Sequence, residues 1–218
     1  MIKLVAVAIA AGLLALLWRR WRDQRRRAFI DGYPYREALD HRLAARRPEL
    51  TEAQRADVLA GLRDYFQMCH AAGRRLVAMP SQAVDDAWHE FILFTRRYDT
   101  FCRGAFGRFL HHTPAEAMRS PTAATDGIKR AWRLACAREG IDPKAPRRLP
   151  RLFALDAALG LAGGFVYHLD CMAAPAGTAG TGYCASHIGC GGGCSGDSGS
   201  ADGGDGGGDG GGCGGGGD

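Results

Sequence analysis

The sequence predicts an all-α protein whose body is a small domain of about four or five helices. Apolar side chains recur at intervals of three and four residues through the middle of the chain, and helix-capping signals precede these stretches. No stretch there shows the apolar and polar alternation of a sheet. We divide the 218 residues into an N-terminal anchor with an Arg-rich flank (1–27), a helical domain (28–170) and a Gly/Cys-rich tail (171–218).

The N-terminal segment has the composition of a membrane anchor. No charge interrupts the run from Leu4 to Trp18, and only Lys3 precedes it. A cleaved signal peptide carries its positive charge before the apolar stretch, so we expect no cleavage here. The run is shorter than the roughly 20 residues that cross a membrane, but Trp18 and Trp21 can extend it as interfacial anchors.

Arginines crowd the C-terminal side of the apolar run, namely Arg19, Arg20, Arg22, Arg25, Arg26 and Arg27. The positive-inside rule places this side in the cytoplasm, so we expect a single-pass protein whose body faces the cytoplasm. Each arginine could gain on the order of 1 kcal/mol from anionic lipid headgroups. The alternative is an amphipathic or buried helix beside a solvated Arg run. Nucleic acid is a less direct partner for arginines next to an apolar helix, and no specific nucleic acid is predicted.

The first two helices of the body are marked by their boundaries. The stretch 35–47 has helix-forming composition and ends before Pro48. The residues TEAQ at 51–54 then form a capping box for a second helix, which we expect to end near Gly73. The apolar face of this second helix consists of Leu59, Leu62, Phe66 and Cys69.

A third helix is expected after Pro80, with Ser81 as its cap, continuing to Cys102. Its apolar face consists of Val84, Trp88, Phe91, Thr95, Tyr98 and Cys102. A fourth helix is expected from Pro121 to Glu139, with Ser120 as its cap and Ile128, Trp132, Ala135 and Cys136 on one face. The last apolar run, 152–169, is interrupted by Asp156 and glycines and is not predicted to be a second membrane span. In a cytoplasmic body, the cysteines on these faces, Cys69, Cys102 and Cys136, are expected to be reduced core residues.

Candidate functional residues gather in the third helix. Asp85 and His89 are four residues apart and share a helix face, while Asp86 lies three residues before His89 on its other flank. A carboxylate there can orient the imidazole, as a metal ligand or a general base requires. Trp88 points toward the core, which places His89 at the edge of the core.

The chain turns after Gly107 and carries His111 and His112 back toward this helix. The candidate donors are therefore Asp85, His89, His111 and His112, with Cys102 nearby, and zinc suits nitrogen and thiolate donors. Three interpretations stay open: a core-edge histidine bonded to a carboxylate, a metal site, and a catalytic site. No residue stands in a recognisable nucleophile motif.

The tail holds a second, weaker metal candidate. Its soft donors have the spacing Cys-x-x-His-x-x-Cys-x-x-x-Cys and are Cys184, His187, Cys190 and Cys194. Structural zinc sites usually separate two ligand pairs by a longer loop, so a flexible tract that happens to carry thiols is the alternative. The density of glycine from Ala173 onward leaves too little apolar area to offset the ordering entropy, and this tract is expected to be disordered.

The pattern Val84, Asp85, Trp88 and His89, followed by a Tyr, a Cys and a His before Pro114, resembles the signature of glycine-rich domain-containing proteins. The resemblance covers roughly residues 30–140 and recurs in the glycine-rich end. Members occur in bacteria and as larger plant proteins, so the resemblance implies a bacterial inner-membrane location for the anchor. It implies a fold and a motif but no agreed activity. Plant members tend to show Trp-His-x-His, where this chain has Phe91.

Two classes of function follow from these residues. The first is a membrane-anchored, non-catalytic helical module that binds an unknown protein partner and carries a candidate metal site. The second is a metal-dependent, zinc hydrolase-like enzyme built from Asp85, His89, His111 and His112. For plant members of the resembling family, RNA binding has been proposed from a separate segment, but this chain shows no aromatic RNP-type motif.

Overall fold

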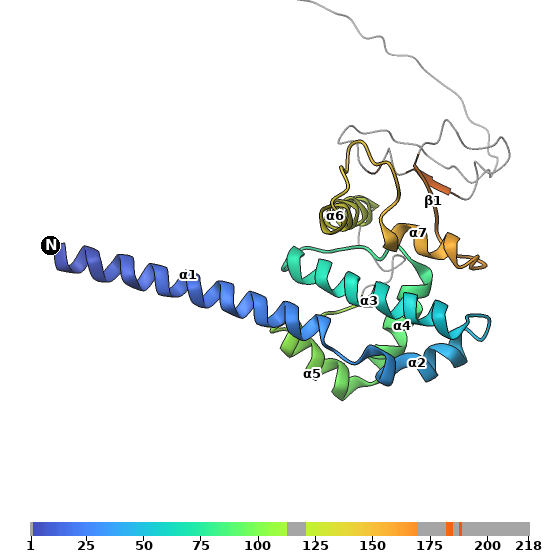
Figure 1. The fold of residues 1–218 in the computed structure, drawn as a ribbon, viewed down its shortest axis with the longest axis horizontal. Helices are drawn as coiled ribbons and strands as arrows, with labels where there is room; N and C mark the ends of the chain where they lie inside the picture. The colour runs from blue at the N-terminus through green and yellow to red at the C-terminus, as the bar shows by residue number, and fades with distance from the viewer. Residues whose placement is uncertain (1, 113–120, 170–181, 185–187, 189–218) are drawn as a thin grey trace, which may run out of the picture.

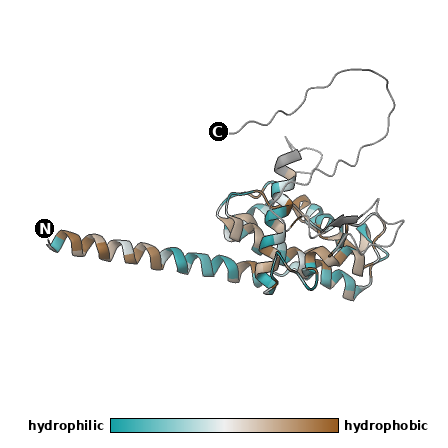
Figure 2. Ribbon diagram, turned by 90° about the horizontal axis from the view of Figure 1, so that it is seen from above, coloured by the Kyte–Doolittle hydropathy of each residue, from teal (hydrophilic) through white to brown (hydrophobic). Residues whose placement is uncertain are grey.

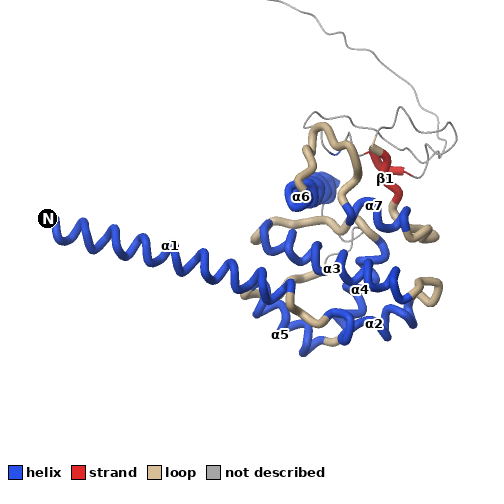
Figure 3. Tube along the Cα trace, viewed as in Figure 1, coloured by secondary structure: helices blue, strands red, loops and turns tan. Residues whose placement is uncertain are grey.

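A computed structural model of the chain describes residues 2–112, 121–169, 182–184 and 188. The described part confirms the all-α class, with seven helices and a two-stranded sheet (Figures 1 and 3). The helices are α1 (Ile2–Asp31), α2 (Tyr35–Arg46), α3 (Glu52–Ala72), α4 (Gln82–Leu93), α5 (Thr95–Phe106), α6 (Pro121–Glu139) and α7 (Arg151–Ala158). The strands are β1 (Val166–His168) and β2 (Gly182–Cys184).

The core lies between α2, α3 and α4, which all contact one another. The expected apolar face of α3 is buried, and its capping box is present, with the Thr51 side chain accepting a hydrogen bond from the Gln54 backbone. On α6, Trp132 is fully buried and donates a hydrogen bond from Nε1 to the backbone oxygen of Pro143 at 3.0 Å. The cysteines expected in the core, Cys69, Cys102 and Cys136, are free and buried.

The prediction of one continuous helix from Ser81 to Cys102 is wrong. The helix ends at Leu93, and a new helix starts at Thr95 after Phe94 leaves helical geometry with φ −82° and ψ 58°. The break has a packing reason: α4 contacts α2, α3 and α7, while α5 packs against α1. A straight helix could not reach both sets of neighbours. Because of this break, the described part of the body has six helices, one more than the upper end of the predicted range of four or five.

The last apolar run forms part of the core. Its short helix α7 buries Leu152, Phe153 and Leu155 against α3 and α4. The chain then forms β1, which pairs in parallel with β2, with Tyr167 opposite Tyr183. Among the described helices, α1 is long and apolar enough to cross a membrane. The two-stranded sheet was not predicted from the sequence.

Helix α1 projects from the body as a single long rod (Figure 1). Figure 2 shows its outer half in hydrophobic colours and the following turns in hydrophilic ones. The apolar part is exposed, with Leu4 at 76% and Trp18 at 54% exposure, so it does not pack into the core of the described body. The inner end is docked: Ile30 is fully buried, and His70 Nε2 lies 2.6 Å from Asp23 Oδ1. The last turns of α1 therefore belong to the body.

Several predictions concern residues outside the described part of the chain. Ser120, the expected cap of α6, is one of them. In the expected tail, His187, Cys190 and Cys194 also lie outside the described residues, as does most of the glycine tract. The backbone of Cys184 is described, and it belongs to β2.

Candidate metal centre

The N-terminus of α4 is fixed by a buried carboxylate from α7. Asp156 is 2% exposed and accepts hydrogen bonds from Ser81 Oγ at 2.6 Å and from the backbone nitrogens of Gln82 at 2.7 Å and Ala83 at 3.2 Å. The backbone nitrogen of Phe165 donates a fourth at 2.9 Å. Ser81 is the N-cap as predicted, and its side chain accepts from the backbone of Val84. Because free helix N–H groups need acceptors, Asp156 holds the first turn of α4 in place.

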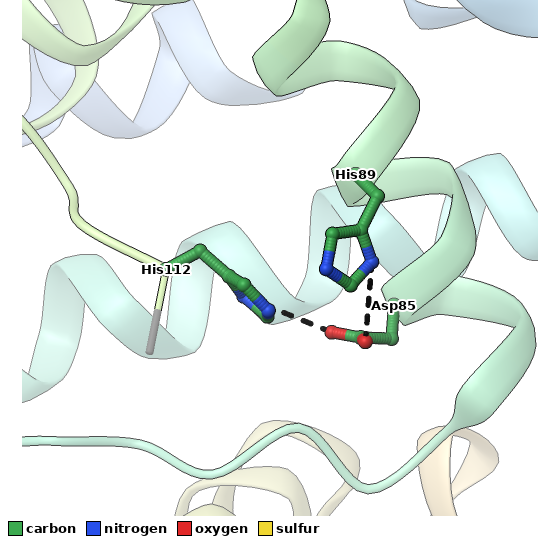
Figure 4. Close-up of side chains that lie close together, drawn as sticks. All are labelled: Asp85, His89 and His112. Carbon is green, nitrogen blue, oxygen red and sulfur yellow. Dashed lines mark ion pairs between the residues drawn. The ribbon is translucent and has the colours of Figure 1, made fainter. Parts of the chain in front are cut away.

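Three of the predicted donors meet on one side of α4. The ligand atoms of Asp85, His89 and His112 all lie within 4.8 Å of one another. Asp85 Oδ2 lies 3.3 Å from His89 Nδ1, and Asp85 Oδ1 lies 3.8 Å from His112 Nδ1 (Figure 4). The two imidazole rings meet edge to face with centroids 4.4 Å apart. The expected pair within the helix is thus joined by a histidine from the segment after α5.

A chain of hydrogen bonds places His112. Trp88 Nε1 donates to the hydroxyl of Tyr98 at 3.0 Å, and that hydroxyl donates to the backbone oxygen of Leu110 at 2.6 Å. The Trp88 ring also meets the His112 ring edge to face at 4.5 Å. This chain links α4, α5 and the segment 107–112, so Trp88 helps to position the site. Trp88 was predicted to belong to the candidate functional cluster and to point toward the core, but its bond to Tyr98 was not predicted.

The electrostatics of the site suit metal binding. The His112 side chain is 13% exposed, and its burial, together with the neighbouring His89, lowers its pKa to about 4. It is therefore neutral at pH 7, the form in which imidazole binds a metal. Among the described residues, neither ring nitrogen of His112 nor Nδ1 of His89 has a hydrogen-bond partner. Buried polar atoms are usually satisfied, and a metal ion would satisfy these.

Three other predicted members lie elsewhere. Asp86 does not flank His89 but faces α2, where Arg47 Nε donates to it at 2.7 Å and Arg46 Nη2 at 3.2 Å. His111 is exposed and packs on Phe109, with ring centroids 4.9 Å apart. The cluster therefore contains His112 and not His111.

The third, Cys102, is fully buried in the core. Burial raises the pKa of its thiol, which makes it a poor thiolate donor, and it is not among the three clustered ligands.

These features define the class of protein: an all-α domain with a helix that is long and apolar enough to cross a membrane and with an Asp/His cluster that could hold a metal. The chain belongs to the UCP032817-like family, whose model matches residues 25–188, and the name of that family states no activity. No curated protein and no solved structure matches the chain.

The family match corrects the resemblance to glycine-rich domain-containing proteins, which was wrong. The residues that carried the resemblance have positions in the fold that do not depend on membership of that family. Trp88 packs in the core, and Asp85 and His89 are neighbours one turn apart. The match also ends at residue 188, before most of the glycine tract. Glycine-rich composition arises in unrelated chains and identifies no family by itself.

Proposed function

We propose that this protein is a membrane-anchored helical module that binds a divalent metal through Asp85, His89 and His112. The observation that carries the proposal is the convergence of three ligand atoms within 4.8 Å. Two imidazoles and one carboxylate are a donor set that zinc accepts in proteins, which makes zinc the expected ion. A partner on the cytoplasmic face would recognise the loaded module.

A second candidate function is supported by the number of ligands. Structural zinc sites usually have four protein ligands, whereas catalytic sites have three and keep one position for water or substrate. The described cluster has three donors, and its His112 also lines a cavity. A metal-dependent hydrolase is therefore the alternative. In it, the protein ligands would orient the ion, and the metal would lower the pKa of a bound water.

The metal proposal is tested on the full-length protein purified in detergent. We expect about one zinc per chain by elemental analysis, because three clustered donors form one site. His89→Ala and His112→Ala should lose the ion. The matched control is His41→Ala, because His41 is exposed on α2 and outside the cluster. A wild-type protein that stays metal-free after dialysis against zinc would overturn the proposal.

The two candidates separate by activity. A zinc-loaded wild type that hydrolyses esters or phosphoesters, with hydrolysis lost in His89→Ala, would support the enzyme. Stoichiometric zinc without hydrolysis would support the binding module.

The anchor is supported by exposure and by the tryptophans at the end of the apolar run. Arg22 lies over the Trp18 ring at 4.4 Å and Arg25 over the Trp21 ring at 4.8 Å, as amphipathic groups at an interface would. The arginine excess supports a body in the cytoplasm. Leu13→Arg with Leu16→Arg should release the protein from membranes under alkaline extraction, because each charge costs about 2.5–3.5 kcal/mol at the centre of a span.

Orientation has its own test. Protease added to inside-out vesicles should digest the body, and protease added to right-side-out vesicles should spare it. The reverse result, or a wild type found in the soluble fraction, would contradict the anchor as proposed.

A further inference from the structure

A cavity of about 190 Å³ adjoins the metal centre. It is formed by the end of α3, by the connection 74–79 that leads into α4, and by the segment 108–112. Its apolar wall includes Tyr65, Trp88 and Leu110, and His112 belongs both to the cavity and to the metal centre. Pockets for drug-sized ligands occupy about 300–1,000 Å³, so this cavity suits a small ligand or one chemical group of a larger ligand.

The charged side chains that line the described part of the cavity are of one sign. Arg74, Arg75 and Arg108 line it together with two histidines, and among the described residues no aspartate or glutamate does. Within the described part of the chain, no ion pair joins any of these three arginines to a carboxylate. Three cationic groups around one small cavity make a positive potential, which attracts an anion.

Two arginines elsewhere in the body are paired with carboxylates. Arg47 binds the buried Asp86, and Arg55 binds Asp40 at 2.8 Å. These guanidinium groups are paired with carboxylates within the fold. The arginines of the cavity keep donors for a ligand from outside, and the planar guanidinium matches the geometry of phosphate.

Arg108 is held in place for such a ligand. Its Nη2 donates to the backbone oxygen of Gly73 at 2.6 Å and its Nη1 to that of Phe109 at 3.2 Å. These two bonds leave part of its five-donor fork unused. A side chain ordered before binding loses less entropy on binding, which favours affinity.

The cavity lies near the inner end of α1. His70 lies on α3, three residues before Gly73, and contacts Asp23 of α1. Gly107, which precedes Arg108, lies against the Arg26 side chain of α1. Asp23 and Arg26 follow Trp21 by two and five residues, about 3–8 Å along the helix axis. A membrane that ends at the tryptophans would place its headgroups close to the arginines of the cavity.

We propose that this cavity binds a phosphate group, carried either by a small soluble phosphorylated compound or by an anionic lipid headgroup. The arginines supply the charge, and the apolar wall receives the first atoms of the group attached to the phosphate. The inference goes beyond the metal centre, with which it shares His112, and the arginine contacts need no metal.

The soluble source is tested with inorganic phosphate, titrated into the full-length protein in phosphatidylcholine nanodiscs after treatment with a chelator. Calorimetry should show saturable binding, weakened about tenfold or more by Arg74→Gln with Arg75→Gln, because two charge-assisted contacts are lost. The matched control is Arg133→Gln, an exposed arginine of α6 that does not line the cavity and should leave binding unchanged. His89→Ala should bind phosphate normally, which separates this test from that of the metal centre.

The lipid source is tested by reconstituting the full-length protein in vesicles of equal parts phosphatidylcholine and phosphatidylglycerol. After detergent extraction, mass spectrometry should find phosphatidylglycerol retained by the wild type and by Arg133→Gln but not by the double variant. Binding of inorganic phosphate assigns a soluble ligand, and retention of phosphatidylglycerol assigns a headgroup. If neither depends on Arg74 and Arg75, the proposal is overturned, whether or not zinc binds.

Discussion

Polar residues that are neighbours in the sequence lie on two different faces of α4, and the two faces differ in the partners that these residues have. On the face toward α2, Asp86 is 2% and Glu90 7% exposed, and both bind arginines of that helix. On the other face, Asp85, His89 and His112 lie together, and imidazole nitrogens of both histidines lack hydrogen-bond partners in the described part of the chain. One helix thus has one face whose carboxylates bind arginines of the fold and one face whose three clustered donors could hold an ion.

The difference separates a carboxylate that is paired within the fold, Asp86, from one that belongs to the candidate metal cluster, Asp85. A buried charge without a partner is costly, so Asp86 and Glu90 need their arginines for the fold to be stable. Imidazole nitrogens buried without a hydrogen bond also cost free energy, and binding an ion would recover it. Asp85 and Asp86 are adjacent in sequence, but substitution of Asp86 should affect stability and substitution in the cluster should affect binding. Four predictions test this contrast.

The largest effect is expected at Asp156, which anchors the start of α4 and therefore both faces. Asp156→Ala leaves a hydroxyl and three backbone N–H groups without their acceptor, so we expect a loss of about 3–5 kcal/mol in unfolding free energy, with zinc binding lost as well. Urea denaturation measures the loss, and Asp156→Asn, which keeps one acceptor oxygen, should lose less. A loss below about 1 kcal/mol for the alanine variant would show that α4 does not depend on this cap.

Asp86→Ala should destabilise the fold while keeping the metal. The side chain is buried, but the guanidinium groups of Arg46 and Arg47 reach water, so about 2–3 kcal/mol is expected, below the full cost of breaking a buried pair. Denaturation and zinc analysis are measured on the same sample. Glu49→Ala is the control, since the Glu49 side chain is 53% exposed and its pair with Arg47 is worth less than about 1 kcal/mol. Loss of zinc from folded Asp86→Ala would contradict the separation of the faces.

Tyr98→Phe tests the link that places His112 on the binding face. The variant removes the hydroxyl between Trp88 and Leu110, which should cost about 1–2 kcal/mol and weaken zinc binding, because His112 follows Leu110 by two residues. Zinc affinity is measured by competition with a chromophoric chelator. Tyr33→Phe is the control, because Tyr33 packs on the core outside the cluster. Unchanged affinity in Tyr98→Phe would mean that His112 holds its place without this bond.

The smallest effect on intrinsic stability is expected at His89. Without metal, His89→Ala should change the unfolding free energy by less than about 0.5 kcal/mol, because its side chain is 40% exposed. Zinc at about 100 times its Kd should stabilise the wild type by about 2.7 kcal/mol and the variant not at all. Thermal denaturation with and without zinc checks both statements, with His41→Ala as the control. Equal stabilisation of the wild type and His89→Ala would place any zinc outside the cluster.

Local features of the fold and the site were predictable from the sequence. The capping box at Thr51, the Ser81 cap and the apolar face of α3 depend on residues within a few turns of each other. The same holds for Asp85 and His89, whose spacing of one turn brings them together in any α-helix.

Features that depend on distant contacts were not predictable. Asp156 is more than 70 residues from the helix it caps, and in sequence it only interrupts an apolar run. The choice of His112 over His111 depends on the bond from Tyr98 to Leu110, which fixes how the segment after α5 turns. The break at Phe94 likewise reflects the separate neighbours of α4 and α5.

The sequence by itself determined the all-α class, the apolar helix at the N-terminus and the pairing of Asp85 with His89, because helical periodicity and capping are local properties of a chain. The tertiary structure alone decided that Asp86 stabilises the fold and that His112 completes the cluster. Those roles depend on which partners come within a few ångströms, and packing between helices sets that distance.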